Sequence, residues 1–303
     1  MIYTLNLTPA LDYTLDLNEF NIGSINKPTK ENITIGGKGI NVSLNLNSLG
    51  VDSTILTILA GFTGQYLKQQ LDLLNIKNEC LFVDGLTRIN VKIRKPIETA
   101  INANSPKVSI DDFISLINKN TFVDGDYICI CGNLQDNIYL DAFNYLKEKT
   151  RNTNVKFIID VSKPKSFFKS LELNPFLVKP NLEELEGLFN VKLSNNIDIC
   201  KYAKELIKLG AQNVIVSLGD NGAILVNKEI CLHAKTRDIE VYNTVGCGDA
   251  LVTGFLYKYI KTNDIIDSFK FAICSGTYKA SCNNYLNLDE ITKFLNDTKL
   301  NYI

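Results

Sequence analysis

Apolar runs and helix-like segments alternate along most of the chain, and this alternation is the clearest sign of its fold. Residues 53–59 form an apolar run, and residues 64–74 follow with apolar positions at helical spacing. The same rhythm predicts strands at 2–7, 126–131, 155–161, 176–178 and 214–217, and helices at 138–148, 182–189 and 199–209. Strands that alternate with helices predict an α/β fold with a mainly parallel central sheet covered by helices on both faces.

Four short segments do not follow this rhythm. In the first three of them apolar and polar side chains alternate, which is typical of strands that have one solvated face, and the fourth is expected to add another strand. They lie at residues 13–17, 32–35, 89–93 and 99–102. We predict that they form a small antiparallel sheet, or lid, drawn from about residues 12–17, 32–35 and 88–102 of a single domain that spans residues 1–303.

The first glycine-rich segment, Gly36-Gly-Lys-Gly-Ile-Asn-Val42, begins a predicted helix that ends at Gly50. Glycine backbone at the start of a helix allows a ligand to approach closely. Lys38 adds a positive charge, and Asn41 adds a hydrogen-bond donor and an acceptor. These residues favour a phosphorylated or polyhydroxylated ligand, although a plain glycine turn with a solvated lysine has the same pattern.

The second glycine-rich segment, Thr244-Val-Gly-Cys-Gly-Asp-Ala-Leu-Val-Thr-Gly-Phe255, lies between a strand-like run at 239–242 and a predicted helix. Gly246 and Gly248 let several backbone N–H groups point at one spot, beside the positive end of the helix dipole. Asp249 lies at the same place. Such donors beside a carboxylate suit phosphoryl transfer to a hydroxyl, in which negative charge develops on one atom and a proton leaves another. The competing interpretation is a glycine turn with an aspartate helix cap.

Polar residues follow four of the predicted strands. Asp12, Asn181, Ser217 and Asp249 each come just after such a run. The carboxyl ends of parallel strands meet at one edge of a sheet, and ligands of α/β proteins bind beyond that edge. We therefore expect these four side chains to line one site.

Composition narrows the classes of function. The 303 residues carry a net charge of -1, which gives no reason to expect a nucleic-acid partner, and no apolar run is long enough to span a membrane. His233 is the single histidine, which argues against a histidine-based triad or a zinc site of several histidines. The eight cysteines contain no Cys-x-x-Cys pair, which predicts buried free thiols in a reducing compartment. We therefore expect a soluble cytoplasmic protein without a signal peptide.

Four motifs, in this order, resemble those of the PfkB family of ribokinase-like, ATP-dependent carbohydrate kinases. They are Gly36-Gly-Lys-Gly-Ile-Asn-Val42, Lys179-Pro-Asn-Leu-Glu-Glu184, Ser217-Leu-Gly-Asp-Asn-Gly-Ala223 and the segment that begins at Thr244. Together they extend over nearly the whole chain. The resemblance implies a ribokinase-like three-layer α/β sandwich with a β lid, and the use of ATP and Mg²⁺.

Within this family the chain looks most similar to bacterial 1-phosphofructokinases, which phosphorylate fructose 1-phosphate to fructose 1,6-bisphosphate. The similarity lies in Thr8-Pro-Ala-Leu-Asp12, Ala60-Gly-Phe-Thr-Gly64 and Thr87-Arg-Ile-Asn-Val-Lys-Ile93. A tagatose-6-phosphate kinase, or another hexose-phosphate kinase, has the same layout and is the alternative. A third hypothesis is a sugar-phosphate sensor without catalytic activity, and the intact Asp249 argues against it.

The resemblance also implies roles for the residues that handle the acceptor. Asp249 would remove the proton from the substrate hydroxyl, and the N–H groups of Gly246, Cys247 and Gly248 would bind the transferred phosphoryl group. Cys247 replaces the usual alanine, which is tolerated if only its backbone N–H acts. The acceptor would be held by Asp12, Gly37 and Asn41 at its hydroxyls, by Lys27, Lys38 and Arg88 at its phosphate, and by Asn133 in place of a serine.

The resemblance places the nucleotide at the remaining motifs. Asn181 and Glu184 match an Asn-x-x-Glu motif that the family uses for magnesium and nucleotide phosphates, with Glu184 acting on the metal through water. The adenine is expected beside the helix that begins at Ile265. The residues expected to bind ATP are Lys179, Asn181, Glu184, Ser217, Gly219, Gly222 and Gly248.

A homodimer is the expected assembly. The lid strands are solvated on one face only, so their other face would leave apolar surface on a monomer. A second copy of the lid would cover this surface, and the same arrangement is implied by the family resemblance.

Overall fold

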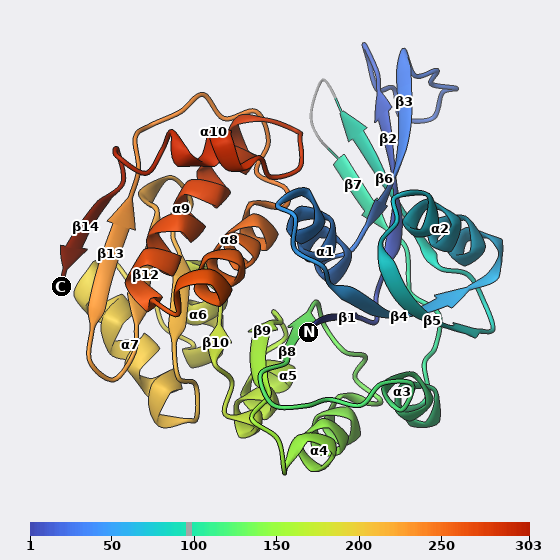
Figure 1. The fold of residues 1–303 in the computed structure, drawn as a ribbon. Coiled ribbons are helices and arrows are strands. Elements are labelled where there is room, and N and C mark those ends of the chain that lie inside the picture. Colours follow the sequence, from blue (N-terminus) through green and yellow to red (C-terminus); the bar gives the residue numbers. More distant parts are fainter. Residues whose placement is uncertain (95–98) are drawn as a thin grey trace.

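A computed structural model, which describes residues 1–94 and 99–303, shows a three-layer α/β sandwich with a small second sheet beside it (Figure 1). The central sheet has ten strands in the order β14-β13-β12-β11-β10-β9-β8-β1-β4-β5. Neighbours from β11 to β5 pair in parallel, whereas β12, β13 and β14 extend one edge in antiparallel pairs. The strands are β1 (Ile2–Asn6), β4 (Thr54–Ala60), β5 (Lys77–Val83), β8 (Tyr127–Cys131), β9 (Lys156–Asp160), β10 (Leu177–Val178), β11 (Val214–Ser217), β12 (Ala223–Val226), β13 (Cys231–Lys235) and β14 (Lys299–Tyr302). The predicted α/β fold is confirmed.

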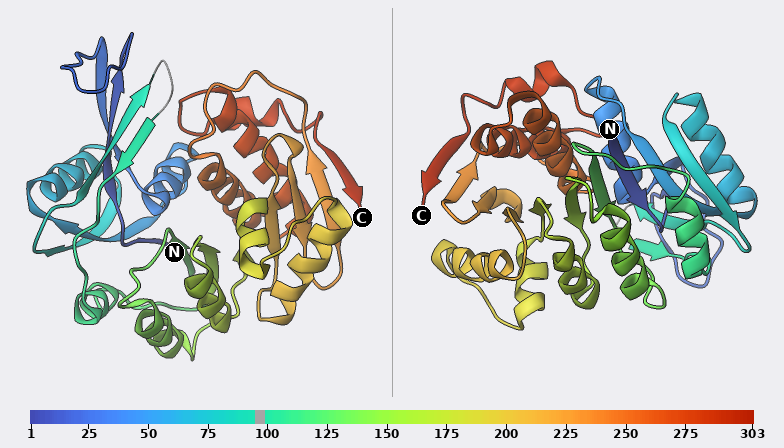
Figure 2. Two further views of the ribbon diagram at one scale, coloured as in Figure 1. Left: turned by 180° about the vertical axis from the view of Figure 1, so that it is seen from behind. Right: turned by 60° about the horizontal axis from the view of Figure 1, so that its bottom comes forward.

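Helices cover both faces of this sheet, as the right-hand view of Figure 2 shows. One layer buries Phe113, Phe143 and Phe167 in a core cluster with the sheet, and the other buries Phe255 and Phe269 in a second cluster. The first layer contains α3 (Ile110–Ile117), α4 (Tyr139–Thr150), α5 (Pro164–Ser170), α6 (Leu182–Phe189) and α7 (Asn196–Lys208). The second contains α1 (Lys38–Ser48), α2 (Gly61–Leu73), α8 (Cys247–Thr262) and α9 (Ile265–Ser281), with α10 (Leu288–Thr292) packed on α9. Within residues 1–94 and 99–303, no helix has the length and apolar character needed to cross a membrane.

The second sheet, which we call the lid sheet, has four strands in the order β3-β2-β6-β7. They are β2 (Ala10–Asp16), β3 (Lys30–Gly36), β6 (Arg88–Arg94) and β7 (Thr99–Asn102). The two outer pairs are antiparallel, as predicted. The central pair, β2 with β6, is parallel, because the chain crosses the main body between them. Part of the predicted lid, residues 95–98, lies outside the described residues.

The two faces of the lid sheet differ in chemistry. Strand register pairs Asp12 with Asn90 and Thr14 with Lys92, so side chains at even-numbered positions of β2 and β6 share one face. The polar face carries Asp12, Thr14, Asp16, Lys30, Asn32, Thr34, Lys92 and Arg94, which all line one cleft. The apolar face carries Leu11, Tyr13, Leu15, Ile33, Ile35, Ile89, Val91, Ile93 and Ile101. The predicted alternation is therefore confirmed, and it separates a polar side that lines the cleft from an apolar side.

The strand-like run at 239–242 does not form a strand in the structure. Among residues 1–94 and 99–303, no strand pairs with it, and the N–H of Tyr242 donates instead to the carbonyl of Ala280 at 2.8 Å. Val241 is 47% exposed, so the run lacks the packing that stabilises a strand. Asp12 lies within β2, in agreement with the predicted lid segment at about 12–17, so it does not stand at the carboxyl end of β1.

Several elements gave no clear signal in the sequence. They are β5, α3, α5 and the antiparallel edge formed by β12, β13 and β14. The strands β12, β13 and β14 have only four or five residues each, and β12 and β13 are hairpin partners. These elements complete the edges of the central sheet and one helix layer.

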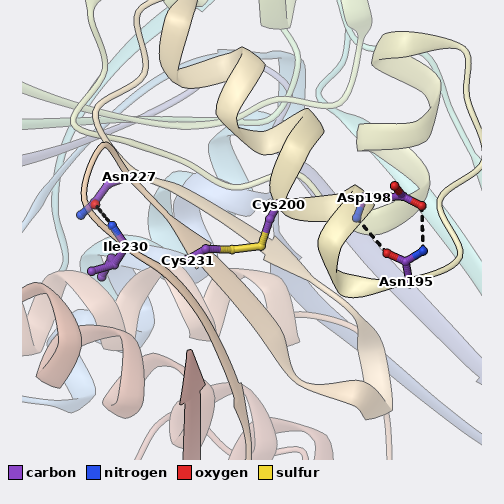
Figure 3. The surroundings of a disulfide bond; sticks show 6 residues. All are labelled: Asn195, Asp198, Cys200, Asn227, Ile230 and Cys231. Carbon is purple, nitrogen blue, oxygen red and sulfur yellow. Dashed lines mark hydrogen bonds between the residues drawn. A yellow bond between two sulfur atoms is a disulfide. The ribbon is translucent and has the colours of Figure 1, made fainter. Parts of the chain in front are cut away.

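One prediction about the cysteines is wrong. All eight were expected to be free thiols, but the structure joins Cys200 of α7 to Cys231 of β13 in a disulfide (Figure 3). The two residues are 31 positions apart, with Cα atoms separated by 6.4 Å. Their proximity arises because α7 packs against the β12–β13 edge, a contact that spacing in the sequence does not reveal. Cys129 and Cys131 are buried free thiols, as expected.

Candidate active site

Two clefts meet where α1 and α8 begin, and they share Asn41, Val245 and Gly246. The larger, of about 770 Å³, lies over the carboxyl ends of β9, β10 and β11, and we call it the sheet-edge cleft. The smaller, of about 440 Å³, lies between the polar face of the lid sheet and the segment before α8, and we call it the lid cleft. Residues at the junction can therefore contact ligands in both clefts.

Asp249, in the first turn of α8, lines the sheet-edge cleft beside this junction. Its side chain is buried, and its Oδ2 accepts a hydrogen bond of 2.7 Å from the Nδ2 of Asn41. Burial and the nearby Asp160 carboxylate raise the pKa of Asp249 to about 6, against the opposing effects of Asn41, Lys38 and Lys179. A carboxylate with this pKa is ionised at neutral pH and is more basic than an exposed aspartate, which suits a general base.

The glycine turn before Asp249 has the geometry that an anion site needs. Gly246 caps α8 in the left-handed region, with φ of 81°. In the described part of the chain, the N–H groups of Gly248 and Asp249 have no acceptor, as expected for the first turn of a helix. The N–H of Cys247, by contrast, donates to the carbonyl of Thr244 at 3.3 Å. Gly248 is therefore better placed than Cys247 to bind an anion in this conformation.

Asp160, at the end of β9, holds two lysines beside that turn. Its Oδ1 lies 3.0 Å from the Nζ of Lys38 and 3.3 Å from the Nζ of Lys179. Burial raises the pKa of Asp160, but Lys179 and Lys38 outweigh that effect and hold the pKa below its ordinary value. A Cβ atom at Gly248 would lie 3.2 Å from the Nζ of Lys179. Two ammonium groups are thus fixed within the sheet-edge cleft, where they can attract phosphate.

Asn181 and Glu184 form a capping box at the start of α6. The Oδ1 of Asn181 accepts from the N–H of Glu184 at 2.7 Å, and the Oε2 of Glu184 accepts from the N–H of Asn181 at 2.9 Å. This reciprocal pair satisfies two N–H groups that a helix start leaves open. Both residues line the sheet-edge cleft, so the motif stabilises α6 and also faces the ligand space.

The turn after β11 closes another side of the sheet-edge cleft. Ser217, Gly219 and Gly222 all line it. Gly222 has φ of 80°, and a Cβ there would lie 2.0 Å from the carbonyl oxygen of Ala234, so this position requires glycine. Apolar and small residues form the other wall: Ile239, Val241, Leu251, Ile273, Gly276 and Ala280. A flat aromatic base fits such a wall, and Ile273, Gly276 and Ala280 lie on α9, where the adenine was predicted.

The donor set of the sheet-edge cleft fits Mg²⁺ that arrives with a nucleotide. Within residues 1–94 and 99–303, no group of three His, Cys, Asp or Glu side chains is placed to hold a metal ion. Glu184 lines the cleft, and the nearby carboxylate of Asp160 is already paired with two lysines. Mg²⁺ is often bound by one or two carboxylates together with substrate phosphates and water, which is what Glu184 and a bound nucleotide can provide.

Asp12 is the fixed carboxylate of the lid cleft. Its Oδ1 accepts from the Nδ2 of Asn90 at 2.9 Å, and its Oδ2 accepts from the Nζ of Lys92 at 2.7 Å. Gly36 lies opposite on β3, where a Cβ would approach Asp12 Oδ2 to 3.0 Å. Held from two sides in this way, the carboxylate is suited to accept hydrogen bonds from hydroxyl groups of a ligand.

Three predicted phosphate ligands lie outside the lid cleft. Lys38 lines the sheet-edge cleft and pairs with Asp160. Arg88 lines neither cleft, and its Nη2 donates to the carbonyl of Thr8 at 3.0 Å. Lys27 is exposed in the connection between β2 and β3. This conformation therefore does not bring the three cations together.

Two other predicted acceptor residues have structural partners. Asn133 accepts from the N–H groups of Ser162 and Lys163 and donates to the Ser162 hydroxyl at 2.8 Å, so it joins the loops after β8 and β9. Gly37 caps α1 with φ of 127°, and a Cβ there would lie 2.2 Å from the Nδ2 of Asn6. Neither residue lines the lid cleft.

The structure also adds residues that the sequence did not single out. Asp160 could have been found, because it ends a predicted strand as the other polar residues do. Lys92 lines the lid cleft and belongs to the Thr87–Ile93 motif, which could have singled it out, whereas Lys279 lines the cleft without a motif. Lys279 donates to the carbonyls of Asn283 and Asn284 at 3.2 and 2.9 Å, and burial lowers its pKa.

Comparison with known proteins agrees with this geometry. Residues 6–285 match the family described as pfkB family carbohydrate kinase. A 1-phosphofructokinase from Borreliella burgdorferi is 40% identical over 298 residues, which are 97% of this chain and 96% of that protein. A 1-phosphofructokinase from Bacillus subtilis is 34% identical, with 92% of each chain covered.

Other relatives are named as kinases of different sugar phosphates. A D-tagatose-1-phosphate kinase from Bacillus licheniformis is 30% identical, with 92% of each chain covered. A tagatose-6-phosphate kinase from Staphylococcus epidermidis is 31% identical, with 84% of each chain covered. The same fold occurs in phosphofructokinase-2 from Escherichia coli with substrates and products, at a TM-score of 0.89 and 25% identity over 97% of this chain and 98% of that one. Its tetrameric inhibited form has a TM-score of 0.88, 26% identity and the same coverage.

Proposed function

This chain belongs to the pfkB family of carbohydrate kinases, and from this membership we propose that it transfers the γ-phosphoryl group of ATP to fructose 1-phosphate. The product would be fructose 1,6-bisphosphate. One observation carries the proposal: the buried carboxylate of Asp249 lines a cleft suited to a nucleotide and accepts a hydrogen bond from Asn41, which also lines the cleft covered by the polar face of the lid sheet. The acceptor is taken from the two relatives named 1-phosphofructokinase.

The proposed reaction begins at the free hydroxyl of the sugar phosphate. Asp249 accepts the hydroxyl proton while the oxygen attacks the γ-phosphorus, a new O–P bond forms, and the bond to the β-phosphate oxygen breaks to release ADP. The N–H groups of Gly248 and Asp249 stabilise the charge on the transferred group, together with the dipole of α8. Lys38 and Lys179 attract the phosphates from the sheet edge.

The nucleotide and its metal are proposed to occupy the sheet-edge cleft. Glu184 would hold Mg²⁺ through water, and the ion would supply charge neutralisation for the phosphates. Asn181, Ser217 and Gly219 line the space for the phosphates and ribose, and the apolar wall beside α9 receives the adenine. Gly222 shapes the turn that holds these residues.

The acceptor is proposed to lie in the lid cleft. Asp12 and Asn41 would bind sugar hydroxyls, and Asn41 would also keep Asp249 oriented through the hydrogen bond of 2.7 Å. The sugar would enter between the lid sheet and α1, and the lid would exclude water from the reaction. Arg88 and Lys27 can join the site only if the lid sheet moves or a second copy approaches.

We also propose a homodimer formed through the apolar face of the lid sheet. Ile33 is 47% exposed and Ile101 is 59% exposed, although both belong to a continuous apolar face. A second lid sheet with the same chemistry would cover this face. The polar face would remain free for the sugar.

A panel of acceptors tests the proposed function directly. ATP-dependent ADP release would be measured with fructose 1-phosphate, fructose 6-phosphate, tagatose 1-phosphate, tagatose 6-phosphate and the unphosphorylated sugars. Fructose 1-phosphate should have the highest kcat/KM. A clear preference for a tagatose phosphate would favour the second candidate, which the tagatose kinases at 30% and 31% identity support. Binding of sugar phosphates without any ADP release would instead identify a sensor.

A further inference from the structure

Lys92 belongs to the Thr87–Ile93 motif, but the family resemblance gave it no role, and the structure places it in the lid cleft. It lies on β6, in register with Thr14 of β2, and so belongs to the polar face. Its Nζ lies 2.7 Å from the Oδ2 of Asp12, and both side chains are only 18% exposed. An ammonium group carries three donors, and the contact with Asp12 uses one of them. The others are available to a ligand in the cleft.

The arrangement of the two clefts decides which cations an acceptor phosphate can reach. An acceptor hydroxyl must lie at Asp249, and Asn41 connects that carboxylate to the lid cleft. Lys38 and Lys179 lie on the other side, paired with Asp160 in the sheet-edge cleft. The far end of the sugar therefore points away from them and toward the polar face of the lid sheet.

Three other cations line the lid cleft, but Lys92 is the one fixed beside the sugar-binding carboxylate. Lys279 already donates to two backbone carbonyls. Lys30 lies at the exposed start of β3, and Arg94 ends β6. Lys92 is held by a strand and by Asp12, so it loses little side-chain freedom when it binds an anion.

We propose that Lys92 binds the phosphate that the acceptor already carries and thereby selects phosphorylated over unphosphorylated sugars. This inference rests on the proposed sugar-phosphate kinase function and adds a specificity-determining residue to it. Asp12 keeps the ammonium in place and binds sugar hydroxyls, so one ion pair recognises both the sugar and its phosphate. The family resemblance assigned the binding of this phosphate to Lys38. In the lid cleft, Lys92 takes that role instead.

The test compares two acceptors in two variants. Lys92→Met removes the charge and keeps the length of the side chain, whereas Lys92→Arg keeps the charge. Initial rates with ATP would be measured for fructose 1-phosphate and for fructose. We expect Lys92→Met to lower kcat/KM for fructose 1-phosphate by about 10- to 100-fold, mainly through KM, because a charge-assisted hydrogen bond is lost. Because Lys92 also helps to hold Asp12, kcat/KM for fructose should fall as well, but by a clearly smaller factor, and Lys92→Arg should restore most of the preference.

Lys77→Met is the matched control, because Lys77 forms an exposed 2.6 Å pair with Asp52 and lines neither cleft. It should leave both acceptors unaffected, and thermal melting of all variants would show that they fold. An equal loss on both acceptors would overturn the inference, because Lys92 would then act only by positioning Asp12. If fructose is turned over too slowly, its inhibition constant against fructose 1-phosphate gives the same comparison. A wild-type protein that releases no ADP with any sugar phosphate would refute the proposed function itself.

Discussion

Burial gives Asp249 both its basicity and a cost in stability. The carboxylate is enclosed at the start of α8, and its pKa rises to about 6 because the charged form loses hydration and faces Asp160. A proton acceptor with this pKa is active only when ionised. Replacement of Asp249 should therefore change both kcat and the free energy of unfolding.

Replacement of Asp249 should abolish most of the catalysis. Asp249→Asn keeps the hydrogen bond partner of Asn41 but cannot take the hydroxyl proton, so kcat should fall by at least about 10²-fold with little change in KM for ATP. In the wild type, kcat/KM should decline as pH falls below about 6. Asp267→Asn, in the exposed first turn of α9, is the matched control. Near-normal turnover of Asp249→Asn would contradict the assignment of the base.

The same substitution should stabilise the folded protein. The pKa of Asp249 is raised on folding, so its ionisation opposes folding: the penalty is absent below about pH 4, grows as pH rises to about 6, and is constant above. A rise from 3.8 to about 6 corresponds to about 3 kcal/mol. Asp249→Asn should therefore show a higher free energy of unfolding than wild type at pH 8, and the difference should disappear near pH 4. Urea titrations at both pH values would measure it, and a less stable variant at pH 8 would contradict the argument.

At the scale of elements, the Asn181–Glu184 motif both stabilises the start of α6 and lines the cleft proposed for the nucleotide. Its capping box satisfies the first N–H groups of the helix, and the same side chains face the sheet-edge cleft. The signal Asn-x-x-Glu is readable in the sequence because capping is local. Its second role, to line the sheet-edge cleft, depends on the position of the end of β10, which fixes where α6 begins.

Two cap substitutions separate these roles. Asn181→Ala and Asn195→Ala each remove an N-cap side chain, from α6 and α7 respectively. Each should lower the free energy of unfolding by about 1 kcal/mol. Only Asn181→Ala should raise KM for ATP, because Asn195 lines neither cleft. Equal KM values for the two variants in steady-state kinetics would show that Asn181 acts as a cap alone.

In the lid sheet, by contrast, the local pattern predicts the strands but not the direction in which they pair. Alternation of side chains predicted each strand and its two faces. The parallel pairing of β2 with β6 could not be read from it, because direction depends on the path of the chain through β4 and α2. Lys92 reaches Asp12 only through this pairing.

At the scale of the whole molecule, the apolar face of the lid sheet should set the oligomeric state. Ile33→Lys and Ile101→Lys place charges on this face and should convert a dimer to monomers in sedimentation velocity. Ile197→Lys, at an exposed position of α7, should leave the dimer intact. A dimer that persists in both lid variants would rule out this interface, and a wild type that is monomeric over a concentration series would rule out the dimer.

Much of this protein was determined by its sequence alone. The strand and helix rhythm predicted β1, β4, β8, β9, β10 and β11 of the central sheet, and glycine spacing placed Asp249 at the start of a helix. These features depend on residues that are close together in the chain. The same holds for the α6 cap and for the two faces of the lid sheet. These are local preferences of backbone and burial, and they survive without knowledge of the fold.

Tertiary structure decided which distant residues meet. It joined Cys200 to Cys231 across a helix–sheet contact, and it assigned Lys38 to the sheet-edge cleft by pairing it with Asp160, which comes 122 residues later. It also placed Lys92 beside Asp12. Long-range ion pairs depend on sheet order and crossover direction, which sequence periodicity does not record. The sequence therefore identified the chemistry of the site, and only the fold divided its charges between the two clefts.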